Sequence, residues 1–372
     1  MRLQKISTFL ANRYRSLDKG LLYSSYILIF FGILLTFAAS PGVAARNGLE
    51  TFYFVKKQLL FLLPMIGVLF MMSFLDSKMI RRIAGLGLLV SVLLMVYVFI
   101  GGVETKGARR WISLFGFSLQ PSEFMKPCFA VVCAWLLASG RLIRSFPGYI
   151  LSAVLYVIVA LLLVKQPDVG MLITVSCIFG VQLFLAGIPW SLVFGLIGFG
   201  CTGLMAAYHF FDHVRTRVNW FLNPQPGEAY QVEKSMETLK NAGWLGKGPG
   251  EGVVKTELPD AHTDFIMAVS AEEFGFIITA VLIGTFAFFI IRGLYLMREE
   301  NNYFSQLAVG GLLTQFAIQA IINMSSTLNL IPTKGMTLPF ISYGGSSLVS
   351  IGLAFGIILG LTRRHTLSRG LE

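Results

Sequence analysis

The residues best suited to chemistry are three carboxylates around one junction in the sequence. Asp264 lies where a long polar segment meets an apolar run, and Glu272 and Glu273 follow within that run. At a helical rise of about 1.5 Å per residue, both glutamates are expected about 12 Å below the start of the helix. At that depth in a bilayer an acidic side chain costs on the order of 2.5–3.5 kcal/mol unless it is paired or hydrated. The sequence therefore predicts a polar cavity there.

A purely structural role for Asp264 is open on the same spacing. Asp is a preferred N-cap, and its negative charge suits the positive end of a helix dipole. Local spacing alone does not distinguish a helix cap from a general base.

Basic residues gather in the segment 101–122. Lys106, Arg109 and Arg110 lie beside Trp111. Arginine can grip phosphate oxygens in a bidentate fork, so the segment could hold a phosphorylated ligand. The alternative is an anchor in the headgroup region, where Trp and Arg are common.

Two further charged pairs or turns stand at the ends of apolar runs. Glu123 and Lys126 are spaced i,i+3, so they can pair on one helical face. Asp168 lies in a short turn between two apolar runs and could be no more than a hairpin cap. His209, Asp212 and His213 are a weak metal hypothesis, because no further His or Cys completes a ligand set.

Composition indicates what kind of chain must position these residues. Of 372 residues, 55% are hydrophobic and 13% are charged, and the mean hydropathy is +0.72. A soluble chain would carry about a quarter charged residues. Here successive apolar blocks are each long enough to cross a bilayer. All four cysteines lie inside such blocks, which argues against a disulfide framework. We therefore predict an all-α polytopic membrane protein.

The apolar blocks predict about ten transmembrane helices in one membrane domain, residues 21–362. A basic segment, 1–20, precedes it and a short tail, 363–372, follows it. The expected spans lie near residues 21–40, 55–75, 82–101, 123–139, 149–164, 170–187, 189–208, 266–291, 304–324 and 340–362.

The segment 209–265 is then a large loop between the seventh and eighth spans. It is expected to contain a short amphipathic helix after Tyr230 and a glycine-rich stretch, 243–252. Once this loop is discounted, Lys and Arg are in excess on the side that holds both termini, and such an excess marks the cytoplasmic side. The loop is therefore expected to be extracytoplasmic.

Several motifs, kept in order along nearly the whole chain, resemble the SEDS family of shape, elongation, division and sporulation proteins. Two others look like the division branch rather than the elongation branch. The family motifs are 106–112 (KGARRWI), 120–124 (QPSEF), 166–170 (QPDVG), 258–265 (LPDAHTDF) and 338–347 (LPFISYGGSS), and the branch motifs are 246–252 (GKGPGEG) and 332–335 (PTKG).

The resemblance implies a peptidoglycan glycosyltransferase with ten transmembrane helices. Such proteins polymerise lipid II into glycan strands in the cytoplasmic (inner) membrane, and the division branch works at the septum. The implied partners are a class B penicillin-binding protein that supplies the transpeptidase, other divisome membrane proteins and membrane lipids. No nucleic-acid partner is expected.

The resemblance also assigns roles. It makes Asp264 the family's essential aspartate, and thus the candidate base that deprotonates the attacking sugar hydroxyl. Since a pyrophosphate leaving group needs no proton, one base with cations or a divalent ion (Mg²⁺ or Mn²⁺) could suffice. The resemblance also matches Glu123 and Lys126 to a cavity-lining polar pair and Lys334 to a basic loop position. Together with the candidate cations Arg109 and Arg110, these are the expected substrate-binding residues. The residues expected to support them are Asp168, His262, Glu272, Glu273 and Ser346.

Two alternatives of other classes stay open at this point. A transporter that flips the lipid-linked precursor would also need buried acids and a polar cavity. A non-catalytic division scaffold would tolerate the loss of Asp264.

Overall fold

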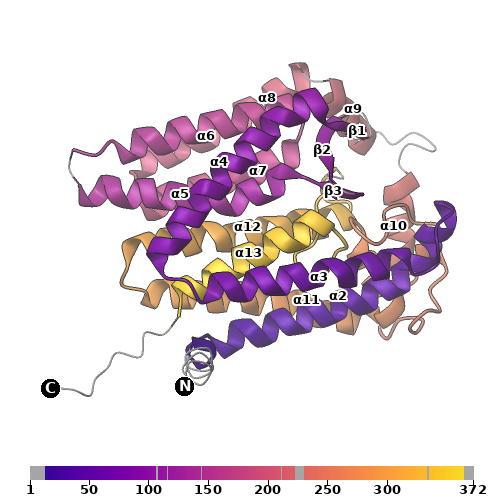
Figure 1. Cartoon of the computed structure of the whole chain (residues 1–372). Helices are drawn as coiled ribbons and strands as arrows, with labels where there is room; N and C mark the ends of the chain where they lie inside the picture. Colours follow the sequence, from indigo (N-terminus) through magenta and orange to yellow (C-terminus); the bar gives the residue numbers. More distant parts are fainter. Residues whose placement is uncertain are drawn as a thin grey trace.

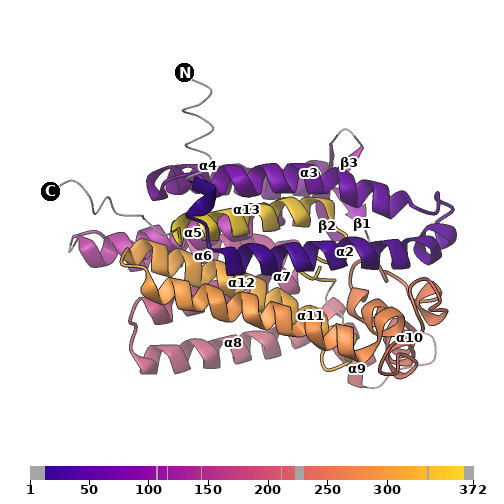
Figure 2. The same ribbon diagram turned by 90° about the horizontal axis from the view of Figure 1, so that it is seen from below.

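The computed structural model is a bundle of long helices with a small sheet at one end (Figure 1). The segments 1–12, 106–107, 223–229, 333–334 and 364–372 and the single positions 115, 144 and 211 are not described. Both views place the start of α2 and the end of α13 towards one end of the bundle and the strands, α9 and α10 at the other (Figures 1 and 2). The bundle therefore has two chemically different ends.

The described helices follow the apolar blocks of the sequence, and each of the ten expected spans overlaps one of them. Their bounds are α2 Lys19–Arg46, α3 Tyr53–Ser73, α4 Ser77–Gly101, α5 Pro121–Leu142, α6 Gly148–Lys165, α7 Val169–Leu185, α8 Trp190–Phe210, α9 Asp212–Leu222, α10 Tyr230–Lys240, α11 Ile266–Glu299, α12 Tyr303–Thr327 and α13 Gly345–Leu361, with a 3₁₀ turn, η1, at Val254–Thr256.

Seven described helices are long and apolar enough to cross a membrane: α2, α3, α4, α5, α6, α11 and α12. Two more, α7 and α13, are apolar but have 17 residues each. The predicted class, an all-α membrane protein, is confirmed at this level. The amphipathic helix expected after Tyr230 is confirmed as α10.

Two expectations were wrong in detail. The segment 101–122 holds three short strands, β1 Val103–Thr105, β2 Ala108–Leu114 and β3 Phe117–Leu119, in an antiparallel sheet of order β1-β2-β3. The last helix begins at Gly345 and not near 340, because the chain before it is irregular and Phe340 has a φ of 65°.

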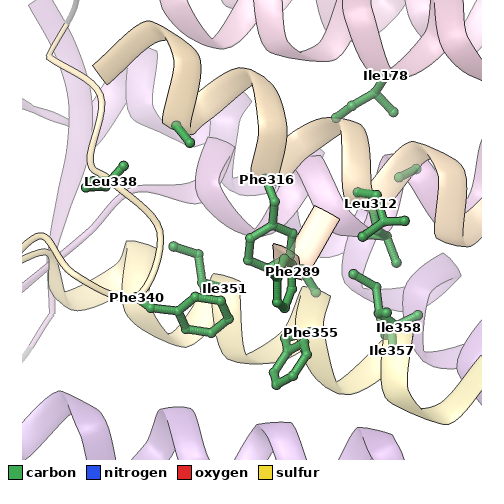
Figure 3. Packing of buried hydrophobic residues seen from close by; sticks show 14 of the residues in the cluster. Ile178, Phe289, Leu312, Phe316, Leu338, Phe340, Ile351, Phe355, Ile357 and Ile358 are labelled. Carbon is green, nitrogen blue, oxygen red and sulfur yellow. The ribbon is translucent and has the colours of Figure 1, made fainter. Parts of the chain in front are cut away.

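The centre of the bundle is formed by α5 and α12. Their spanning stretches are 67% and 72% buried, against 22% for α6 and α11, which face outward along most of their length. A cluster of phenylalanines fills the space between α11, α12 and α13 (Figure 3). Within it, Phe340 stacks on Phe316 and meets Phe289 and Phe355 edge-on, at centroid distances of 5.4, 5.8 and 5.4 Å. The core thus fixes the irregular segment that precedes α13.

Candidate active site

Asp264 lies immediately outside the start of α11. The helix begins at Ile266, its N-cap residue is Phe265, and that residue makes no side-chain cap bond. The structural alternative for Asp264, a helix N-cap, is therefore wrong. Its side chain is partly exposed, whereas Phe265 and Ile266 are buried in the core.

The backbone on the N-terminal side of Asp264 is tightly held. The three consecutive carbonyl groups of residues 262–264 accept hydrogen bonds from the backbone N–H of Tyr343, the Ser342 hydroxyl and the Asn323 side-chain amide, at 2.9, 2.6 and 3.0 Å. Each carbonyl is thus satisfied by a different group from the C-terminal third of the chain. A backbone held at successive residues positions its side chains with little freedom.

His262 contributes to this rigidity through its ring. The imidazole is buried between Phe54 of α3 and Tyr343, with ring centroids 4.1 and 5.3 Å apart. This packing attaches the Asp264 segment to α3.

The beginning of the segment is fixed by charges from two other helices. Arg46 of α2 donates to the carbonyls of Glu257 and Leu258 at 2.9 and 2.6 Å. Lys234 of α10 pairs with Glu257 at 2.7 Å and with Glu237 at 2.9 Å. These side-chain hydrogen bonds, the one to Glu257 first, raise the pKa of Lys234 above its ordinary value. Lys234 therefore stays charged and keeps α10 against the loop.

The carboxylate of Asp264 faces Gly335. A Cβ built on this glycine would lie 3.6 Å from Oδ2 of Asp264, and the glycine has a φ of 64°, which strains other residues. Lys334 precedes Gly335 in the sequence but lies outside the described residues. The chain that carries the expected basic residue therefore returns to the proposed base.

The predicted ion pair between Glu123 and Lys126 forms in the first turns of α5. The carboxylate oxygen lies 2.9 Å from the ammonium nitrogen, and the two side chains are 5% and 0% exposed. The Ser350 hydroxyl of α13 donates to the Glu123 carbonyl at 2.6 Å. This pair is embedded in the centre of the bundle, so each charge depends on the other.

The two arginines that were expected to act together are separated by the pleat of β2. Arg109 is exposed and pairs with Glu104 at 3.4 Å. Arg110 turns to the α6–α7 turn, where it donates to the carbonyls of Gln166, at 3.0 Å, and Pro167. Successive side chains of a strand point to opposite faces. Of the two, Arg109 is thus the guanidinium available to a ligand.

Asp168 completes the anchor of the sheet. It lies 3.6 Å from the Arg110 guanidinium, caps α7 by accepting from Met171 N–H at 3.2 Å, and accepts from the Gln120 side chain at 3.4 Å. The Gln120 N–H in turn donates to the Ser346 hydroxyl of α13 at 3.4 Å. The cap reading of Asp168 is confirmed, and Ser346 joins the same network.

The polar cavity expected around Glu272 and Glu273 was a wrong interpretation. Both glutamates are 0% exposed, and their carboxylates are surrounded by hydrogen-bond donors of the protein itself. Glu272 accepts the backbone N–H groups of residues 253–255 at 2.9 to 3.0 Å. Glu273 accepts those of Gly250 and Gly252 and pairs with the Lys255 ammonium. The glutamates therefore clamp the glycine-rich loop.

A break in α11 makes this clamp possible. Gly275 has φ 76° and ψ −179°, so the helix is interrupted about two and a half turns after its start at Ile266. Gly246 lies against this break. A Cβ built on Gly246 would fall within 2.6 Å of the backbone of residues 273–275, and one built on Gly275 would fall within 2.6 Å of the backbone of residues 244–246. Glu272 and Glu273 thus lie on a short helical piece beside the loop rather than deep in a continuous span.

Glu272→Gln is expected to release this loop. Both oxygens of the Glu272 carboxylate accept backbone N–H groups, whereas the glutamine side chain has only one acceptor oxygen. Each hydrogen bond to a charged acceptor is worth about 1.5–3 kcal/mol. Hydrogen exchange of amides 253–255 should therefore accelerate by about tenfold or more, measured by mass spectrometry. Glu251→Gln is the matched control, because Glu251 is an exposed carboxylate of the same loop. Equal protection in both variants would contradict the clamp.

Metal ligation has no support in the described geometry. Among the residues that the structure describes, no group of three or more His, Cys, Asp or Glu side chains could hold an ion. Asp212 of the weak histidine hypothesis instead pairs with Arg215 at 2.6 Å.

Residues that the sequence interpretation did not single out as site residues are Asn323, Ser342 and Tyr343, which hold the Asp264 segment. A signal existed for the first of them. Gln315, Gln319 and Asn323 recur at four-residue spacing in an otherwise apolar helix, so they share one face of α12. All three are buried.

Comparison with known proteins gives a consistent result. A family model of cell cycle proteins, covering FtsW, RodA and SpoVE, matches residues 19–367. A Caulobacter vibrioides protein named probable peptidoglycan glycosyltransferase FtsW is 42% identical over 349 residues, which are 94% of this chain and 90% of that protein.

Two solved structures have the same architecture. A chain of a peptidoglycan synthase complex, whose structure concerns the coordination of polymerization and crosslinking, superposes with a TM-score of 0.77 at 27% identity, covering 93% of this chain and 97% of that one. The rod shape determining protein RodA of Thermus thermophilus superposes with a TM-score of 0.70 at 25% identity, covering 93% and 96%.

Proposed function

Because the chain belongs to the FtsW/RodA/SpoVE family of cell cycle proteins, we propose that it is the peptidoglycan glycosyltransferase of cell division, which polymerises lipid II into glycan strands. The observation that supports this function best is Asp264. It presents a partly exposed carboxylate from a backbone segment that is held at three successive carbonyls. A base fixed in this way is suited to take a proton from a bound sugar hydroxyl.

In the proposed reaction, Asp264 accepts the proton of the acceptor's sugar hydroxyl as its oxygen attacks the anomeric carbon of the donor. The bond from that carbon to undecaprenyl pyrophosphate breaks on the opposite face, which inverts the configuration. Inverting hydrolases need a second carboxyl to protonate their leaving group. Pyrophosphate leaves as an anion, so a single base is sufficient.

Cations must then stabilise the charge that develops on the pyrophosphate. Arg109 is exposed on β2. Lys334 precedes Gly335 in the sequence, and Gly335 lies against the Asp264 carboxylate. Arg110 and Lys126 are engaged by protein carboxylates and act on the substrate through the shape of the site. Among the described residues, no group of three or more His, Cys, Asp or Glu side chains could hold Mg²⁺ or Mn²⁺; such an ion would supply further positive charge to the leaving pyrophosphate.

The proposed setting is the cytoplasmic membrane at the septum. Ten helices, α2 to α8 and α11 to α13, cross the bilayer, and both termini are cytoplasmic. The end of the bundle with the sheet and α10 then faces outward (Figure 1), and the segment of Asp264 lies at the same end because Lys234 of α10 pairs with its Glu257. The likeness to a chain from a peptidoglycan synthase complex supports a class B penicillin-binding protein as the partner.

The function is tested by giving the purified protein and its transpeptidase partner lipid II and resolving the products on a gel. Glycan polymer that depends on this chain is the expected result. Transport of fluorescent lipid II across proteoliposomes without polymer would instead identify a flippase. Neither activity, together with retained recruitment of the partner, would identify a scaffold.

The topology has its own test. In a background without the native cysteines, Asn241→Cys is expected to react with a membrane-impermeant maleimide in intact spheroplasts, whereas Asn301→Cys reacts only after lysis. Both positions are exposed, one after α10 and one between α11 and α12. The reverse labelling pattern would put Asp264 on the cytoplasmic side, where a wall polymerase could not use it.

A further inference from the structure

One side chain connects the segment of Asp264 to the loop that faces it. The side-chain amide of Asn323 donates to the carbonyl of Asp264 at 3.0 Å and to the carbonyl of Met336 at 2.8 Å. Asn323 is 1% exposed and lies in the last two turns of α12. An NH₂ group has two hydrogens, so this bridge uses its whole donor capacity.

The two bridged carbonyls flank the proposed reaction centre. Asp264 carries the base, and Met336 follows Gly335, whose backbone lies against the base's carboxylate. Met336 is itself buried and lies 3.9 Å from the Thr174 hydroxyl of α7. The carbonyl of Met336 thus belongs to a fixed part of the loop, and the Asn323 amide sets the distance between it and Asp264.

Asn323 differs from the other groups that hold the segment. Tyr343 and Ser342 belong to the loop before α13, and their bonds attach this loop to the Asp264 segment. The Ser342 hydroxyl also accepts from Leu338 N–H of the same loop at 2.8 Å. Asn323 comes from α12, a central helix, and its one side chain reaches both the segment before α11 and the loop that follows α12. It therefore joins these two segments to each other at one point of the bundle.

We propose that Asn323 is a positioning residue of the glycosyltransferase: it holds the Asp264 carboxylate in register with the 335–336 backbone. The proposal rests on the proposed function, because it takes Asp264 as the base. Without the two donors, two carbonyls would lose their partners and the segments would shift apart. A displacement of about 1 Å at a reacting group can cost on the order of a hundredfold in rate.

The side-chain type is demanding. Leucine has nearly the same size but no donor. Aspartate has the same shape, but its ionised form presents an anion to two carbonyl oxygens. Glutamine is one methylene longer and would push the two segments out of register. A side chain at position 323 that donates to both carbonyls therefore has to be asparagine.

The test compares Asn323→Leu and Asn323→Asp with Ser326→Ala in the full-length protein with its partner. Ser326 is the matched control, because its hydroxyl donates only to the Asn323 carbonyl within the same buried turn of α12. Steady-state polymerisation should show kcat lower by about tenfold to a hundredfold in both Asn323 variants, with KM for lipid II changed by less than threefold. Ser326→Ala should keep wild-type kcat.

Hydrogen exchange supplies a readout that does not depend on activity. In the Asn323 variants, peptides covering 260–266 and 335–340 should exchange faster together, while peptides of the rest of α12 keep wild-type protection. Wild-type kcat in Asn323→Leu, or exchange that changes only within α12, would overturn the proposal. If the wild-type protein makes no polymer, the proposed function fails, and the exchange result still decides whether Asn323 joins the two segments.

Discussion

Asp264→Asn is expected to reduce glycan polymerisation by about a hundredfold to ten-thousandfold, the usual contribution of a positioned base. The amide has the same shape as the carboxylate but cannot accept a proton from the attacking hydroxyl. The backbone bonds of residues 262–264 do not involve the changed atoms, and Asp264 does not cap α11. The unfolding temperature should therefore stay close to that of the wild type. A lipid II polymerisation gel and thermal unfolding in detergent measure the two quantities.

Asp260→Asn is the matched control for this variant. Asp260 belongs to the same segment and has a φ of 52°, a conformation that Asn also tolerates. Its polymerisation rate is expected to stay near the wild-type value. Full polymer yield from Asp264→Asn would remove the base from the mechanism, and equal losses in both variants would show that any acid in this segment has the same effect.

Glu123→Gln and Lys126→Met are each expected to cost about 3–5 kcal/mol of stability, because each leaves one charge unpaired in the buried centre of the bundle. The double variant removes both charges and should be more stable than either single variant. Unfolding temperatures of the four proteins, in one detergent, form a double-mutant cycle. The expected coupling is large and favourable to the pair.

The surface of the same protein offers the control. Asp212 and Arg215 also form an i,i+3 pair, at 2.6 Å, but their side chains are 88% and 51% exposed. Exposed pairs are worth about 0–1 kcal/mol, so Arg215→Gln should have little effect on unfolding. Additive losses in the Glu123 and Lys126 cycle would mean that the two charges act separately.

The helices could be predicted because their cause is local. A block of apolar residues of membrane length must form a helix, since a bilayer offers no partner for its backbone groups. The pair of Glu123 and Lys126 was predictable for the same reason, because i,i+3 spacing within one helix fixes their proximity. Lone polar residues such as Asn323 could be noticed, but nothing in their own neighbourhood identifies their partners.

The parts that could not be predicted depend on contacts between distant segments. Glu272 and Glu273 seemed to lie deep in a span, because a glycine in an apolar run does not reveal whether the helix continues. The break at Gly275 is imposed by the backbone of Gly246, which reaches it through the long loop. The separate partners of Arg109 and Arg110 likewise followed from a strand that the loop-like composition of 101–122 concealed.

The burial of Glu123 and Lys126 in one helix also bears on how the chain enters the membrane during synthesis. Among the seven described helices that can span, α5 has the lowest hydropathy, 1.3, and it packs against α12 and α13, which the ribosome makes almost two hundred residues later. Until then α5 has no neighbours from the C-terminal third of the chain to shield its charges. Because the ammonium and the carboxylate are one turn apart, the helix brings its own counter-ion to the translocon. The α5 helix can thus insert into the membrane before α12 and α13, the helices that later surround it, have been synthesised.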